Sequence, residues 1–375
     1  MILINPFKGL RPKIHIASKI STPSIGYLSD KLKKNFKLKR SLNFLNILFS
    51  KNFNRSKINL LKMKKKGLIF KDILNCYYIY KITFKKHRQI GIIGKTNLSN
   101  YNDKNILGHE ETFESRVSER EKQIANLSTQ IGPIFTTYKK NSNLKKTLNK
   151  IIKFKPTYSF ESFDKCKHEL WVLNNKKKLK EIKKRLKIIK KLYICDGHHR
   201  VQAMLKINKN LSVMIVAFPK DQIKILDYNP LVKSNLNNDE ILRIIKKNFE
   251  VKELRKIYKA VKPKEFCMYL NKKWYWLKFI KKVNKLDVTI LRNYAINRLL
   301  KNKKELNKKL KFISGIHGSK ILEKNVNSKK FSLAFKLCPT KIDEVINVAE
   351  ARGFMPPKST WFHPKPLDGL ISSEL

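Results

Sequence analysis

The stretch LYICDGHHRVQAML, residues 192–205, combines two patterns of apolar residues. Residues 192–194 form a short apolar run typical of a buried strand, whereas the apolar residues within 201–205 recur at helical spacing. Asp196 and Gly197 lie between the two patterns and are turn formers. The stretch therefore predicts a strand, a tight turn and a helix.

The predicted turn brings anion-binding groups to the start of that helix. The first backbone N–H groups of a helix have no intrahelical partner and carry the positive end of its dipole. Gly197 lets a ligand approach this backbone closely, and Asp196 can cap the helix or hold a metal bound to phosphates. His198, His199 and Arg200 add donors that suit phosphate oxygens. From the residues alone, the alternative remains that this is an ordinary Asp-Gly turn followed by polar residues on a solvent-exposed surface.

The whole chain is expected to fold into two domains, residues 1–233 and 234–375. Its 375 residues are 42% hydrophobic, enough to fill real cores. No apolar run approaches the length that spans a bilayer, and the N-terminus shows no secretory signal. The five cysteines are far apart, odd in number and form no C-x-x-C pair. These features predict a protein of the reducing cytoplasm without membrane partners.

A formal net charge of +56 invites a nucleic-acid interpretation, because Lys and Arg attract phosphate. The cations are 71 Lys against 13 Arg, however, and they are spread along the whole chain. Proteins that recognise specific nucleic-acid sequences usually rely on Arg for bidentate contacts. The basic clusters at 31–40 and 174–191 are better explained as solvated faces, since apolar residues of the second recur at helical spacing. Specific nucleic-acid binding is therefore not expected.

Strands and helices interleave without the regular rhythm of a doubly wound sheet, so the predicted fold class is α+β. Gly132 and Pro133 are expected to end the helix that precedes them. The predicted strands lie at 76–82, 90–94, 134–138, 192–194, 213–218 and within 265–279, and the predicted helices at 112–130, 174–191, 239–249 and from 287 onward. Residues 227–233 are predicted to be a loop, and the block from 331 to 375 to form a strand, a helix and an extended tail.

Several segments resemble one known family. The sequence YICDGHHRVQAML resembles the DGHHR signature of a bacterial and archaeal family catalogued as domain of unknown function 1015 (DUF1015). The resemblance extends over nearly the whole chain. It includes PFKGLRP at 6–12, the His-Glu segment, helix and strand of 108–138, DYNPLVK at 227–233, LDVTIL at 286–291 and MPPKSTWFHPKPLDGL at 355–370.

This resemblance implies a ParB/sulfiredoxin-like fold in the N-terminal part, in which a turn at a helix start grips nucleotide phosphates, and a smaller α+β C-terminal part. A relative within the same fold is a free L-serine kinase. The implied function is phosphoryl transfer from ATP or ADP, with Mg²⁺, to a small hydroxyl compound such as serine. Two alternatives stay open: a non-catalytic ParB-like module that binds nucleotide and DNA, and a degenerate member that binds nucleotide without turnover. The oligomeric state is left undefined.

The resemblance also suggests roles for residues outside the turn. Glu110 becomes the first choice for a base or a metal ligand beside Asp196, and His109 for substrate contact, with His199 as a further catalytic candidate. Without the resemblance, His109 and Glu110 are a lone histidine beside an acidic helix start. Arg120 is a candidate phosphate clamp, or the partner of a neighbouring acid on its helix.

Two prolines hold the backbone extended before Lys358, Ser359 and Thr360, so that these side chains could complete an anion site. A closing edge strand explains them equally well.

One departure bears on activity. Relatives carry an aspartate soon after the N-terminal segment, where this chain has Ile25, and Asp30 could replace it only if the loop is rebuilt. Pro230 stands where relatives have an arginine. Both changes point to a slowed or inactive member.

Overall fold

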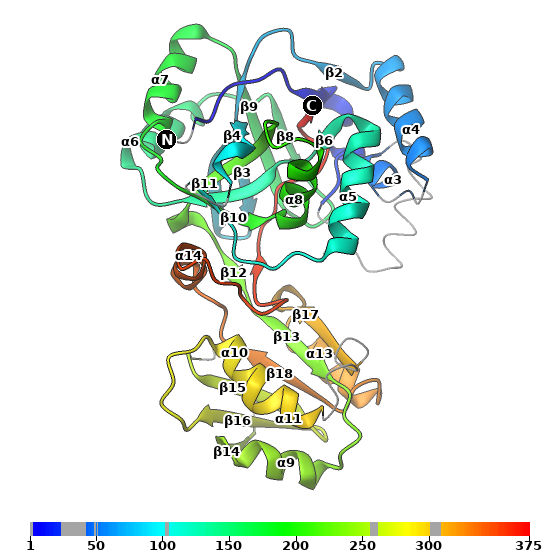
Figure 1. The fold of residues 1–375 in the computed structure, drawn as a ribbon, viewed down its shortest axis with the longest axis vertical. Coiled ribbons are helices and arrows are strands. Elements are labelled where there is room, and N and C mark those ends of the chain that lie inside the picture. Colours follow the sequence, from blue (N-terminus) through cyan, green and yellow to red (C-terminus); the bar gives the residue numbers. More distant parts are fainter. Residues whose placement is uncertain are drawn as a thin grey trace. The chain divides into compact units, whose positions relative to one another are not determined.

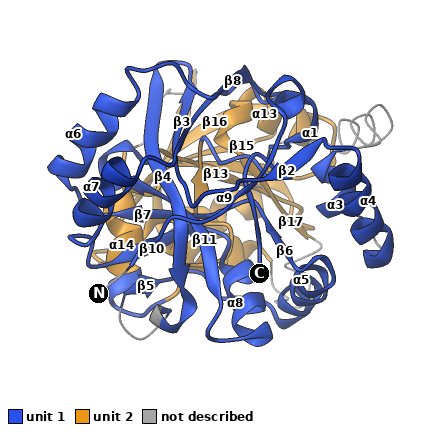
Figure 2. Cartoon of the chain, turned by 90° about the horizontal axis from the view of Figure 1, so that it is seen from above, with its two compact units in different colours: residues 1–223, 349–353, 364–375 blue, residues 224–348, 354–363 orange. Residues whose placement is uncertain are grey.

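In this computed structural model, the described residues are 3–23, 43–48, 50, 52–101, 105–255, 262–300 and 309–375. The basic cluster at 31–40, Ile25 and Asp30 lie outside them. The chain forms two compact units (Figure 2). The first comprises residues 1–223, 349–353 and 364–375, and the second comprises 224–348 and 354–363. The domain boundary expected near residue 233 stays a prediction.

An eight-stranded mixed sheet forms the centre of the first unit (Figure 1). Parallel pairs join β10 to β5 and β11 to β7, and the other neighbours are antiparallel. Its order is β5 (Ile106–Leu107), β10 (Leu192–Asp196), β7 (Ile134–Tyr138), β11 (Ser212–Pro219), β4 (His87–Asn97), β3 (Tyr77–Phe84), β9 (Lys167–Leu173) and β8 (Tyr158–Glu161). The predicted strands of this region are thus confirmed, together with the antiparallel hairpin of β3 and β4.

Four helices pack their apolar residues into the same core as this sheet: α5 (Glu114–Leu127), α6 (Ser142–Ile151), α7 (Lys176–Leu186) and α8 (His198–Ile207). In α7, Ile182 and Leu186 are each 1% exposed, whereas most of its lysines are exposed. The lysine-rich segment is therefore an amphipathic helix, as its apolar spacing predicts.

A second sheet of the first unit has the order β2 (Ile69–Lys71), β1 (Leu10–Pro12), β20 (Ser372–Glu374) and β6 (Thr129–Ile131). Its apolar side chains pack with those of α3 (Phe44–Leu48) and α4 (Phe53–Lys65). The prediction that a helix runs to Gln130 is wrong. The helix α5 ends at Leu127 because Ser128 takes a left-handed conformation, and Thr129–Ile131 then pair with β20.

The second unit contains a six-stranded antiparallel sheet, and its core is formed with helices that include α9 and α10. The order is β14 (Phe249–Leu254), β16 (Lys273–Phe279), β15 (Glu265–Leu270), β18 (Leu333–Leu337), β13 (Tyr228–Val232) and β17 (Leu310–Ser314). A two-stranded ribbon pairs β12 (Ile225–Leu226) with β19 (Trp361–Phe362). The helices are α9 (Asn238–Lys246), α10 (Asp287–Leu291), α11 (Asn297–Leu299), α13 (Lys320–Asn327) and α14 (Ile342–Glu350), whose last residues belong to the first unit.

The prediction of a loop at 227–233 is wrong, since Tyr228–Val232 form β13 inside this sheet. Pro230 is tolerated because the ladder between β13 and β18 covers only Leu231 and Val232, so that no bond of that ladder requires the missing N–H. The fold class α+β is confirmed. No helix in the described part of the chain combines the length and apolar character needed to cross a membrane.

Candidate functional site

The turn after β10 has the strand, glycine and helix geometry that the sequence predicts. Gly197 adopts φ +111° and serves as the N-cap of α8. A Cβ at this position would lie 3.0 Å from Ile134 Cδ1 and 3.2 Å from Arg200 Nη2, so a side chain is disfavoured by both conformation and space. Because glycine offers no capping side chain, the N-cap leaves the first N–H groups of α8 for another acceptor.

Both histidines at the start of α8 hold the loop that precedes α5. The Nε2 atom of His198 accepts a hydrogen bond from the backbone N–H of His109 at 3.2 Å. The Nε2 atom of His199 accepts one from the N–H of Phe113, also at 3.2 Å. A neutral imidazole that accepts at Nε2 carries its proton on Nδ1. The Nδ1 atom of His198 lies 3.5 Å from Glu110 Oε2, so this proton faces the carboxylate.

The rings of His109 and His198 are buried and meet edge to face, with centroids 4.7 Å apart. Burial lowers the pKa of His109 to about 3, and the neighbouring His198 contributes in the same direction. Burial likewise lowers the pKa of His198 to about 4. Both rings are therefore neutral near pH 7. The fully buried His109 is tied to the start of α8 through its backbone N–H, which donates to His198.

Glu110 is the partly exposed member of this group. Its side chain is 37% exposed, while Oε1 lies 3.9 Å from His109 Nε2 and Oε2 lies 3.5 Å from His198 Nδ1. Each carboxylate oxygen thus lies near one histidine ring, and the side chain remains partly exposed to solvent. Such a group can accept a proton or bind a hard cation.

The ion pairs beside the turn include two residues from the end of the sequence, Lys365 and Asp368. Arg200 lies between two carboxylates: its Nη2 is 3.5 Å from Asp196 Oδ2, and its Nη1 is 3.7 Å from Asp368 Oδ1. Lys365 forms an ion pair with Asp196. The Nη1 atom of Arg200 also donates to the carbonyl of Gly132 at 3.3 Å. This ion-pair network fixes the guanidinium at the start of α8.

The two carboxylates of the network differ in their pKa. Burial pushes the pKa of Asp196 upward, but the charges of Lys365 and Arg200 outweigh it and hold the pKa near 2. Burial raises the pKa of Asp368 to about 6, which Arg200 offsets only in part. Asp196 is thus ionised throughout the physiological range, whereas Asp368 titrates near its acidic edge.

The remaining predicted residues divide between the units. Arg120 of α5 donates to Gln123 Oε1 at 2.6 Å, and burial together with the charge of Arg200 lowers its pKa. It therefore belongs to the same group as Arg200. Lys358, Ser359 and Thr360 lie in the second unit. There the Lys358 Nζ lies 5.7 Å from the centre of the Tyr228 ring, and the buried Ser359 hydroxyl donates to the carbonyl of Pro356. Their part in nucleotide binding stays a prediction.

Sequence reasoning missed Lys365 and Asp368. Both stand in the MPPKSTWFHPKPLDGL segment, which was singled out only for its lysine and hydroxyl residues. Their charged side chains, spaced by the prolines and glycine of an extended tail, were the available signal.

The structure thus shows an α+β protein whose strand, glycine and helix turn lies beside the carboxylate of Glu110 and the ion pairs of Arg200. The profile of the family described as "Protein of unknown function (DUF1015)" matches residues 4–292, more than half of the chain. The chain therefore belongs to this family. No curated protein matches the sequence.

Several solved structures are similar in fold at low identity. A free serine kinase in complex with AMP is 14% identical, with a TM-score of 0.40 over 75% of this chain and 92% of its own. A mutant of that kinase in complex with ADP is 15% identical, with a TM-score of 0.40 and the same coverage. A conserved hypothetical protein from Pyrococcus furiosus is 13% identical, with a TM-score of 0.39 over 74% of this chain and 94% of its own.

Proposed function

We propose that the first unit binds an adenine nucleotide at the start of α8 and transfers a phosphoryl group from ATP or ADP to a small hydroxyl compound such as L-serine. The observation that carries this proposal is the convergence of two segments that are distant in sequence. The Glu110 loop is hydrogen-bonded to the first residues of α8, and Glu110 Oε2 lies 3.5 Å from His198 Nδ1.

The residues of the turn fit a phosphate group. A side chain at position 197 would occupy the space between the backbone and the guanidinium of Arg200, because its Cβ would lie 3.2 Å from Nη2. Glycine leaves this space open. The N–H groups of the first helical turn and Arg200 would hold the phosphate oxygens. Asp196 and Glu110 supply the carboxylate oxygens that Mg²⁺ prefers, although Asp196 must then share its charge with Lys365. The bound nucleotide would supply the transferable phosphoryl group, and Mg²⁺ would neutralise its charge.

Glu110 is the residue that would act on the acceptor. Its partly exposed carboxylate would accept the proton of the attacking hydroxyl, and the ring of His198, whose Nδ1 is 3.5 Å from Oε2, lies against it. Such proton transfer contributes about 10²–10⁴-fold to a rate, and positioning and charge neutralisation supply the rest. The two buried histidines act as positioning residues because their lowered pKa values keep them neutral.

The finer fold assignment belongs to the same proposal. A helix start that grips phosphate is what a ParB/sulfiredoxin-like first unit would provide, and the family resemblance supports that assignment. The five cysteines are all free thiols, as a protein of the reducing cytoplasm would have. The proposal requires a nucleotide and a small substrate as partners, and no nucleic acid.

A thermal-shift screen with ATP, ADP and AMP in the presence of Mg²⁺ tests the binding part. At about 100 times the dissociation constant, a bound nucleotide adds about 2.7 kcal/mol to the free energy of unfolding. We expect Arg200→Ala to lose the shift and Arg185→Ala, a substitution on the exposed face of α7, to keep it. A folded chain that no nucleotide stabilises contradicts the proposal.

Phosphorus NMR of the same sample with serine and other small alcohols tests the transfer part. We expect Glu110→Gln to reduce the rate at least about 100-fold, while a nucleotide shift measured without Mg²⁺ persists, because the variant retains Arg200 and the N–H groups of the turn. Glu111→Gln, a change at the neighbouring exposed residue, should retain activity. If nucleotide binds and no alcohol is phosphorylated, the chain is a non-catalytic member of its family.

A further inference from the structure

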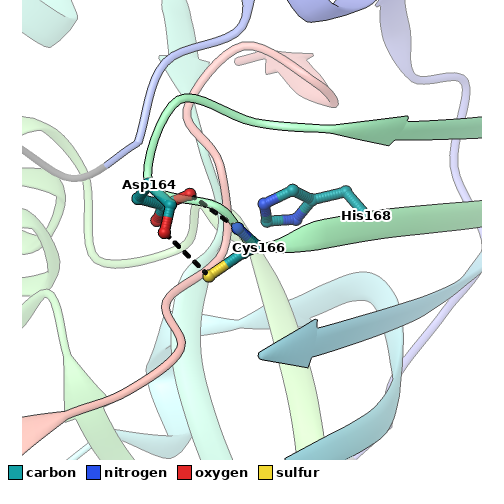
Figure 3. Close-up of side chains that lie close together, drawn as sticks. All are labelled: Asp164, Cys166 and His168. Carbon is teal, nitrogen blue, oxygen red and sulfur yellow. Dashed lines mark hydrogen bonds between the residues drawn. The ribbon is translucent and has the colours of Figure 1, made fainter. Parts of the chain in front are cut away.

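A second cluster of chemically reactive side chains lies at the turn between β8 and β9. Asp164 lies in the turn, Cys166 directly precedes β9 and His168 lies within β9, and the turn brings the three side chains close together (Figure 3). Each offers one donor atom, and the three donor atoms lie within 4.8 Å of one another. The backbone N–H of Ser162 donates to the carbonyl of Cys166 at 2.9 Å, which closes the turn.

The carboxylate of Asp164 has one oxygen without a donor. Its Oδ1 accepts hydrogen bonds from the hydroxyl of Ser162 and from the N–H of Cys166. Its Oδ2 is buried and accepts no hydrogen bond from the described residues. A buried carboxylate oxygen in this state is costly, and a cation bound there would remove the cost.

His168 is already oriented in the way that metal-binding histidines are. Its ring is fully buried, with Nδ1 2.7 Å from the hydroxyl of Tyr80 and Nε2 2.8 Å from the hydroxyl of Ser162. Each ring nitrogen thus has one oxygen neighbour, and a metal at Nε2 would take the place of the Ser162 contact. An oxygen partner on the second ring nitrogen is the usual support of a metal-bound histidine.

We propose that Asp164, Cys166 and His168 bind a zinc ion, with the hydroxyl of Ser162 or a water as the fourth ligand. Thiolate, imidazole and carboxylate are ligands of zinc at about 2.0–2.3 Å, which sets donor atoms about 3.5 Å apart in a tetrahedron. The three donors must therefore close in by about 1 Å. Binding displaces the proton of the Cys166 thiol, and the thiolate and carboxylate then balance the two charges of the ion.

The zinc site is independent of the proposed nucleotide site in its residues and in its test. Its place at a hairpin turn indicates a structural role. The hydroxyl of Tyr80, which supports His168, also accepts a hydrogen bond from the N–H of Leu367 at 3.3 Å. Zinc at His168 would therefore brace the tail segment that carries Asp368.

The experiment uses the full chain, stripped with a chelator and reloaded with Zn²⁺ or Co²⁺. We expect one zinc per chain to survive gel filtration, and Co²⁺ to give the near-ultraviolet charge-transfer band of a cobalt thiolate. Cys166→Ser should abolish that band, and Asp164→Asn and His168→Gln should weaken zinc affinity at least tenfold. Cys267→Ser, which removes another buried thiol in β15 of the second unit, is the matched control and should keep the band.

Two results would overturn the proposal. The first is a folded wild-type chain that retains no zinc and shows no cobalt band. The second is a band that persists in Cys166→Ser. If Cys166→Ser does not fold, Asp164→Asn decides, because that change lies in the turn outside both strands, and unchanged zinc affinity in the folded variant counts against the site.

Discussion

Arg200 is held between one carboxylate that is always ionised and another that titrates near pH 6. The ion pairs to Asp196 and Asp368 fix its guanidinium, but they also offset its charge. Protonation of Asp368 would remove one of these negative charges. The attraction of the turn for phosphate is therefore expected to strengthen as the pH falls toward 6.

Gly197 gives the residue-scale prediction. Gly197→Ala forces a side chain into φ +111° and brings its Cβ to 3.0 Å from Ile134 Cδ1. We expect the free energy of unfolding to fall by about 1–3 kcal/mol, measured by denaturant titration. Gly67→Ala in the same unit separates the two causes, because Gly67 has φ +62° and a Cβ there would meet only the end of the Lys13 side chain, at 3.7 Å. Equal losses in the two variants would show that contact adds nothing at position 197.

The sequence allowed the turn to be predicted but not its charged surroundings. Asp196, Gly197 and Arg200 are neighbours along the chain, so local periodicity and turn chemistry indicate their geometry. Lys365 and Asp368 reach the same place through a tail that pairs far from its position in sequence. No local pattern encodes that approach.

At the scale of elements, asparagine supplies the helix caps. Asn52, Asn141, Asn175 and Asn237 each accept a hydrogen bond from the backbone N–H three residues later, at the starts of α4, α6, α7 and α9. Asparagine is among the preferred N-cap residues. Asparagine thus begins four helices, each of which contains lysine and isoleucine.

The cap of α9 is the strongest of these, because Glu240 reciprocates as a capping box. Asn237→Ala should lower the free energy of unfolding of the second unit by about 1 kcal/mol, since one helical N–H loses its acceptor. Asn238→Ala, at the next exposed position, should change it by less than about 0.5 kcal/mol. Denaturant unfolding followed by tryptophan fluorescence measures both, and similar losses would contradict the capping role.

Helices and strands whose apolar residues recur at regular spacing were predicted. Those that depend on pairing with distant strands were not. The hairpin of β3 and β4 follows from its apolar runs, and the helix α7 from its apolar stripe. The strand β13, predicted as a loop, contains Pro230, a residue that is normally excluded from central strands. Its place in the sheet depends on where the ladder with β18 stops, which is a property of the tertiary fold.

At the scale of the whole molecule, buried histidines set the response to acid. Burial lowers the pKa of His109 and His168 to about 3 and that of His198 to about 4, from 6.5 in the unfolded chain. The unfolded state thus binds more protons between pH 6.5 and these values. The contribution of these histidines to the free energy of unfolding is therefore complete above pH 6.5. It is lost as the pH falls toward 4, by up to about 1.4 kcal/mol per pH unit for each histidine.

Denaturant unfolding of the metal-free chain between about pH 7 and pH 4.5 measures this slope. His198→Gln should reduce it by up to about 1.4 kcal/mol per pH unit, whatever it does to stability at pH 7. His15→Gln, at an exposed residue of the same unit, should leave the slope unchanged. A slope that His198→Gln does not alter would show that this ring is not buried as a neutral group.

The strand β20 has a consequence for the order of the second sheet. Its residues pair with Leu10 of β1 on one side and with Thr129–Ile131 of β6 on the other, so they join strands from early parts of the chain. Without β20, β1 and β6 have no common neighbour in this sheet. Three residues near position 373 therefore determine whether two segments more than 100 residues apart in sequence belong to one sheet.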